Sequence, residues 1–221
     1  MIFTIPELLS AEEVQSLLKR LEAAEAQNKI VDGKTTAGWH AKKVKNNQQL
    51  ANTPAAPLIE EVRKTLLKHP LFQAAARPQR IHTVRFNRYT GGMSYGRHTD
   101  NALMNGYRSD LSFTLFLSDP ETYEGGELTV EGLDSEQAYK LPAGSVIVYP
   151  SSSLHRVDAV TRGVRWAAIG WVQSQIRSHE QREILFELDT VRRSLFNQYG
   201  KTNEFDLISK SLSNLLRQWV E

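Results

Sequence analysis

The spacing of apolar side chains divides the chain into an N-terminal helical part, a central part rich in strands and a C-terminal helical part. Apolar residues recur every three or four positions from residue 11 to about 26, behind a capping box formed by Ser10 and Glu13. This pattern predicts an amphipathic helix. A second helix is expected to begin near Pro57, because proline suits a first helical turn, and to end before Pro70, which a loop should follow.

From residue 80 the apolar pattern changes to a period of two. The segments with this character are 81–89, 111–117, 127–130, 146–149 and 164–172. They are short and separated by turns that contain Gly or Pro, which favours a β-sandwich or barrel over repeated βαβ units. The polar and basic segment from Trp39 to Asn47 fits neither period.

The C-terminal part returns to helical spacing. Ser178 is expected to cap one helix, Gly200 interrupts the pattern, and a second apolar stripe follows between residues 207 and 219. This predicts an αα-hairpin attached to an α+β fold with a mainly β core. The expected division is a domain over residues 1–177 and a helical extension over 178–221, whose apolar face must be covered by the core or by a second copy of the chain.

Composition excludes several classes of function. The chain of 221 residues has a formal net charge of +2, which is too small to indicate a nucleic acid or a membrane surface as partner. It has no Cys, which excludes disulfides, zinc–thiolate sites and thiol catalysis. The first ten residues lack the features of a signal peptide, and no apolar run approaches the roughly 20 residues that span a bilayer. A soluble, cytoplasmic protein is therefore expected.

Candidate chemistry begins with His98 and Asp100, which are two positions apart and so share one side of an extended backbone. Alone, this pair is weak evidence for a metal site. His155, just past the end of the predicted strand 146–149, supplies a possible third ligand. Two imidazoles and one carboxylate form the facial triad of non-haem Fe(II) oxygenases, which leaves coordination positions open, whereas zinc favours a tetrahedral site.

Arginines add a second clue. Arg165 lies ten residues after His155, on a strand face otherwise made of apolar side chains, where a guanidinium is costly unless an anion meets it. Its planar fork suits the far carboxylate of a dicarboxylic co-substrate, although an internal pair with Asp or Glu is an alternative. Four further arginines lie near the expected site and either favour an anionic substrate or are ordinary solvated charges: Arg85, Arg88, Arg97 and Arg108.

With these residues in place, the chain resembles the PKHD-type hydroxylases, in the prolyl-4-hydroxylase-like group of Fe(II)/2-oxoglutarate-dependent dioxygenases. Beyond the triad and Arg165, the similarity rests on the segments 44–49 (VKNNQQ), 86–89 (FNRY), 114–120 (TLFLSDP), 125–128 (GGEL), 149–155 (YPSSSLH), 160–165 (VTRGVR) and 185–189 (LFELD). These segments extend over essentially the whole chain.

The resemblance implies a double-stranded β-helix, or jelly-roll, with N-terminal helices packed against it. It implies that His98, Asp100 and His155 bind Fe(II), that Arg165 anchors 2-oxoglutarate, and that Tyr89 contacts the same co-substrate. The second co-substrate tyrosine of related enzymes has no counterpart in residues 112–116, which contain no phenol.

The expected reaction is hydroxylation of an unidentified small-molecule or peptidyl substrate by dioxygen, with release of succinate and CO2 and with ascorbate as reductant. The resemblance also suggests a link to iron uptake. The alternative is a cupin-like metal-binding sensor without oxygenase activity.

Overall fold

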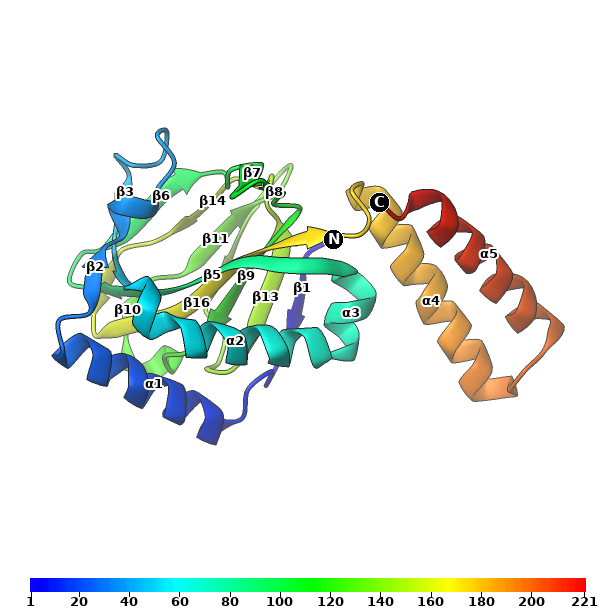
Figure 1. Cartoon of the computed structure of the whole chain (residues 1–221), viewed down its shortest axis with the longest axis horizontal. Helices are drawn as coiled ribbons and strands as arrows, with labels where there is room; N and C mark the ends of the chain where they lie inside the picture. Colours follow the sequence, from blue (N-terminus) through cyan, green and yellow to red (C-terminus); the bar gives the residue numbers. More distant parts are fainter.

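Two antiparallel sheets face each other in the computed structural model, which describes residues 1–221 (Figure 1). The larger sheet has seven strands, in the order β1 (Phe3–Ile5), β13 (Val146–Pro150), β9 (Leu111–Phe116), β16 (Val164–Ser174), β5 (Pro78–Thr90), β4 (Gln48–Leu50) and β2 (Ile30–Asp32). The smaller has five, in the order β12 (Glu136–Tyr139), β11 (Leu128–Glu131), β14 (His155–Val157), β6 (Ser94–His98) and β3 (Lys45–Asn46). Two short pairs complete the set, β10 (Glu124–Gly125) with β15 (Val160–Arg162) and β7 (Leu103–Met104) with β8 (Tyr107–Arg108). The result is a mixed α/β fold built on a large antiparallel sheet.

Three helices, α1 (Ala11–Ala26), α2 (Asn52–Lys68) and α3 (Pro70–Ala76), precede the long strands. Figure 1 shows α1 and α2 side by side across one face of the larger sheet. The predicted capping box is present, since the Ser10 hydroxyl accepts a hydrogen bond from the Glu13 N–H and the Glu13 carboxylate accepts one from the Ser10 N–H. The apolar faces of these helices join the strands in a core cluster of 26 buried residues.

Two sequence predictions for this region are wrong. Helix α2 begins at Asn52, so Pro57 lies inside the helix, not at its start. The proline has no N–H for the carbonyl of residue 53, and a proline in a helix interior costs about 3 kcal/mol. Burial of Leu58, Val62 and Leu66 on the same helix offsets this cost. Residues 70–76 form helix α3 instead of a loop. Pro70 suits the first position of a helix, and Phe72, in the first turn of α3, is completely buried in the core.

The other face of the larger sheet packs on the smaller sheet. Tyr89, Phe116 and Tyr149 from the larger sheet and Leu128 and Val157 from the smaller one belong to a second buried cluster. In the central strands of the larger sheet the side that faces the helices is largely apolar, with Arg88 paired to Glu25 of α1 as an exception. Polar side chains such as Ser112 and Thr114 face the space between the sheets. This space contains the candidate site.

Helices α4 (His179–Tyr199) and α5 (Asn203–Trp219) run antiparallel and extend away from the sheets (Figure 1). Ser178 caps α4 as predicted, accepting a hydrogen bond from the Gln181 N–H. Leu185 and Leu212 are buried together with Ile176 in a small separate cluster. Further along, apolar side chains remain exposed, among them Val191, Phe196 and Leu207. None of the helices combines the length and the hydropathy that crossing a bilayer requires.

Candidate metal and co-substrate site

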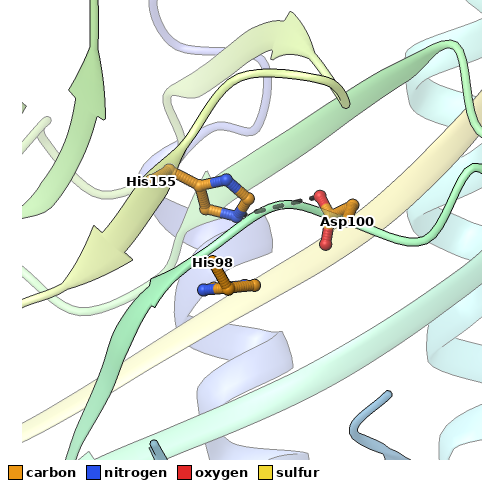
Figure 2. Close-up of side chains that lie close together, drawn as sticks. All are labelled: His98, Asp100 and His155. Carbon is orange, nitrogen blue, oxygen red and sulfur yellow. Dashed lines mark ion pairs between the residues drawn. The ribbon is translucent and has the colours of Figure 1, made fainter. Parts of the chain in front are cut away.

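His98, Asp100 and His155 converge between the two sheets. His98 is the last residue of β6 and His155 the first of β14, and the two strands pair with these residues opposite each other. His155 follows the end of β13, as predicted, and the structure adds that it is the first residue of the next strand. One ligand atom from each side chain lies within 4.8 Å of the others, and Figure 2 shows the three groups gathered around one region.

The hydrogen bonds of both imidazoles leave the same ring nitrogen free. His98 Nδ1 donates to the Gly96 carbonyl at 2.8 Å, and His155 Nδ1 donates to the Ser153 carbonyl at 3.0 Å. Because a carbonyl oxygen only accepts, each Nδ1 carries a proton, and in the neutral ring the lone pair is on Nε2, where it is available to a metal. Burial, and then the neighbouring His155 ring, lower the pKa of His98 to about 4, so that ring is neutral at pH 7.

The Asp100 carboxylate is oriented by Ser112 on β9, which is within hydrogen-bond distance of Ser151 in the turn after β13. Ser112 Oγ donates to Asp100 Oδ2 at 2.6 Å and lies 2.8 Å from Ser151 Oγ. The same Asp100 oxygen is 3.7 Å from His155 Nε2 (Figure 2). Hydrogen-bonded carboxylates and imidazoles of this kind are typical of metal sites, where the outer partners fix the geometry of the ligands.

Two tyrosine rings pack against the imidazoles. Tyr95 stacks on His98, with ring centroids 3.6 Å apart and planes inclined by 19°. Tyr149 meets His155 edge-on at 5.1 Å. Tyr149 lies on β13 opposite Ser112 and is buried, and burial raises the pKa of its phenol well above the usual value. Residues 112–116 contain no phenol, but Tyr149 on the neighbouring strand places one beside the triad.

Arg165 lies directly opposite Tyr89 in the β16–β5 pairing. Its side chain is 1% exposed, and its Nε and Nη2 have no hydrogen-bond partner. The rings of Tyr89 and Phe116 lie under the guanidinium, each 5.3 Å from Cζ to centroid. No carboxylate forms an ion pair with Arg165, so the alternative of an internal pair with Asp or Glu is not what the structure contains.

Gly126 makes room for this arginine. Its φ is +70°, and a Cβ there would lie 2.8 Å from Arg165 Cδ. The close approach explains why a glycine stands at this position in the GGEL segment. Two buried, unpaired N–H groups of a guanidinium form a binding site for an anion, and their fork geometry fits a carboxylate.

A cavity of about 320 Å³ opens beside the triad. The cavity is lined by the triad and Tyr89. Arg165, opposite Tyr89 in the strand pairing, is not among the lining residues. The unassigned segment 39–47 also contributes to the lining, through His40, Ala41 and Lys45. Such a volume is at the lower end of the range for small-molecule sites.

Comparison with known proteins decides the family. A profile described as the 2OG-Fe(II) oxygenase superfamily matches residues 84–173. The chain is 61% identical to a PKHD-type hydroxylase from Picosynechococcus and 60% identical to one from Acaryochloris marina, in both cases covering 100% of both chains. The chain belongs to the PKHD-type hydroxylases. A prolyl-4-hydroxylase from Pseudomonas putida has a similar fold, with a TM-score of 0.57 at 18% identity over 78% of this chain and 92% of that one.

This PKHD-type hydroxylase is therefore a dioxygenase that uses Fe(II) and 2-oxoglutarate, as the sequence predicted. The alternative of a metal-binding sensor without oxygenase activity loses its basis. The residues between the sheets fit both groups, because two imidazoles and a carboxylate suit iron and the unpaired Arg165 donors suit a carboxylate. Sequence reasoning missed Ser112, Tyr149 and Lys45, whose only signal is that each lies in or beside a segment shared with the family.

Proposed function

We propose that His98, Asp100 and His155 are the Fe(II) ligands of this hydroxylase and that Arg165 anchors the far carboxylate of 2-oxoglutarate. The proposal is supported by two features that lie together between the sheets. Three ligand atoms converge with both Nε2 lone pairs available, and an arginine with two unpaired N–H groups is buried in the wall nearby. Tyr89, opposite Arg165, is proposed to contact the same co-substrate.

Each residue has a defined part in this proposal. Neutral His98 and His155 and the Asp100 carboxylate bind the metal, while Ser112 keeps the carboxylate in place. Arg165 fixes the orientation of 2-oxoglutarate, and Tyr95 and Tyr149 exclude water from the imidazoles. The iron, when bound, supplies the activation of dioxygen that hydroxylates a C–H bond, with succinate and CO2 as the other products.

Spectroscopy in the absence of oxygen tests the assignment. Addition of 2-oxoglutarate to the Fe(II)-loaded parent protein should produce a weak visible charge-transfer band. His98→Ala should lose the band, and Arg165→Gln should require at least a tenfold higher concentration of 2-oxoglutarate. The matched controls are His179→Ala and Arg162→Gln, which replace partly or largely exposed residues that do not line the cavity and should behave as the parent. A normal band in His98→Ala would reject the ligand assignment.

Further properties of the protein are proposed together with the site assignment. We infer that the two sheets form a double-stranded β-helix within a dioxygenase domain of residues 1–177, with residues 178–221 as a helical hairpin extension. Ascorbate as reductant, a link to iron uptake and a cytoplasmic location remain predictions from the family resemblance and composition. Turnover with and without ascorbate, expression under iron limitation and cell fractionation test them in turn.

Self-association is proposed through the C-terminal helices. Their exposed apolar side chains, Val191, Phe196 and Leu207, are 49%, 51% and 63% exposed and extend beyond the sheets. A second copy of the chain would cover them. Sedimentation equilibrium should give an oligomer for the parent and a monomer for Phe196→Glu; a monomeric parent would reject the proposal.

A further inference from the structure

The structure separates the four arginines near the site into two groups. Three are matched by carboxylates: Arg88 pairs with Glu25, Arg97 with Glu131, and Arg108 with Asp110 and Glu221. Arg85 has no ion pair and no hydrogen bond to another side chain or to the backbone, although it lines the cavity. One arginine of the four thus presents an unmatched charge to the space beside the triad.

Lys45 adds a second cation to the same cavity. Its side chain is 3% exposed and has no ion-pair partner. Its amine donates to Thr36 Oγ1 at 3.2 Å and lies 5.0 Å from the centroid of the Tyr95 ring, which itself stacks on His98. A neutral hydroxyl and an aromatic face solvate the ammonium partly, but they do not neutralise it.

The balance of charge in the cavity is one-sided. Asp100 is the only carboxylate among the lining residues, and it belongs to the metal site. Burial lowers the pKa of Lys45, and repulsion by the nearby Arg85 charge adds to this effect, whereas the smaller attractions of Asp100 and Asp32 act in the opposite direction. Neither cation forms an ion pair, so a ligand with an anionic group would compensate charge that the protein leaves unpaired.

This pair is separate from the Arg165 site. Arg85 and Tyr89 are four positions apart on β5, which corresponds to about 13 Å along the strand, and Tyr89 lies opposite Arg165. Arg85 instead lies opposite Ile169, towards the other end of the same wall. Apolar residues surround it there, including Leu103, Ile169 and Trp171.

We propose that Lys45 and Arg85 bind the carboxylate or phosphate group of the substrate, so that this hydroxylase acts on a small organic anion. The inference rests on the proposed function for the position of the iron, but the two cations belong to the fold whether or not metal binds. The apolar residues beside Arg85 then contact the carbon skeleton that is presented to the metal.

Binding of matched probes tests the proposal. Benzoate and its neutral counterpart benzamide are titrated by ligand-observed NMR, first into metal-free protein and then into protein saturated with Ni(II) and 2-oxoglutarate, which cannot turn over. In both states the parent should bind benzoate at least tenfold more tightly than benzamide. Arg85→Gln and Lys45→Gln should reduce this ratio to within about twofold, whereas the ion-paired control Arg88→Gln should retain it.

The remaining outcomes are equally decisive. Equal affinity for the two probes in the parent, or an unchanged ratio in Arg85→Gln and Lys45→Gln, overturns the proposal. It is also overturned if Arg165→Gln abolishes the ratio and the other two variants do not, because the anion site is then that of the co-substrate. Failure of the parent to bind 2-oxoglutarate rejects the proposed function alone, since the metal-free titration does not depend on it. Should Arg85→Gln not fold, Lys45→Gln and the charge-retaining Arg85→Lys decide the result.

Discussion

Replacement of Arg165 by methionine should make the ligand-free protein more stable and the co-substrate complex weaker. Each buried donor without a partner costs about 1–3 kcal/mol, and Arg165 has two, Nε and Nη2. Its cation–π contacts with the rings of Tyr89 and Phe116 stabilise the folded protein by about 0.5–2 kcal/mol each. Methionine keeps the unbranched stem beside Gly126 and removes the charge. The free energy of unfolding should therefore rise by roughly 1–2 kcal/mol.

When 2-oxoglutarate is bound, the parent should be more stable than Arg165→Met. At a hundredfold its Kd, the co-substrate stabilises the parent by about 2.7 kcal/mol. Loss of two charge-assisted hydrogen bonds should weaken binding by about a hundredfold, so the same concentration stabilises Arg165→Met by only about 0.4 kcal/mol. Urea unfolding with Mn(II) in every sample, with and without 2-oxoglutarate, measures both effects.

A second buried arginine supplies the control. Arg182 is 4% exposed, but its Nη1 donates to the carbonyls of Ile176 and Arg177 at 2.7 and 3.0 Å. Arg182→Met leaves those carbonyls without this donor and should lower the free energy of unfolding by about 1–3 kcal/mol. If both variants lost similar stability without ligand, unpaired donors at Arg165 would carry no cost, and the reasoning that assigns it an anion would fail.

Three further predictions concern groups around the site. Ser112→Ala removes the hydrogen bond to Asp100 and should weaken metal binding by about 10–100-fold in a Mn(II) titration followed by electron paramagnetic resonance; an unchanged affinity would contradict the role of the serine. Gly126→Ala adds a Cβ 2.8 Å from Arg165 Cδ at a positive φ, so it should lower the urea midpoint and raise the Kd for 2-oxoglutarate, and a neutral effect on both would contradict the crowding. Burial lowers the pKa of Lys45 from 10.5 to about 8, so the unfolded chain binds more protons between these values and the stability of the parent should rise with pH across that window. Lys45→Met should abolish this rise and, below pH 8, be more stable than the parent by at most about 3 kcal/mol; parallel pH profiles would contradict the shift.

The convergence of the three proposed metal ligands could be expected from local sequence features. His98 and Asp100 share a side of extended chain at a spacing of two, and His155 follows a recognisable strand. Arg165 was predictable for a related reason, since a charge on an otherwise apolar strand face requires a partner. Residue type and position within one element made all four residues candidates, and the family resemblance supplied their expected roles.

Other features depend on contacts between distant segments. Lys45 lies in a segment with no periodicity, because short β3 is held by pairing with β6 and not by a pattern of its own. Tyr149 enters the site only because β13 neighbours β9 in the larger sheet. Helix α3 was missed since a proline is compatible with both the end of one helix and the start of the next.

The β5–β16 pair shows how one register sets the positions of both anion sites. The pairing is regular from Val164 to Trp171, and its irregularities begin only after Trp171. Residues two apart therefore face the same side throughout this stretch. Arg85, Tyr89 and Arg165 thus lie on the same face of the larger sheet. A one-residue slip of β5 would turn Arg85 and Tyr89 to the opposite face from Arg165 on β16. Arg85 and Arg165 thus keep a fixed separation along the sheet, so the two proposals together place the co-substrate carboxylate at Arg165 and the anionic group of the substrate at Arg85.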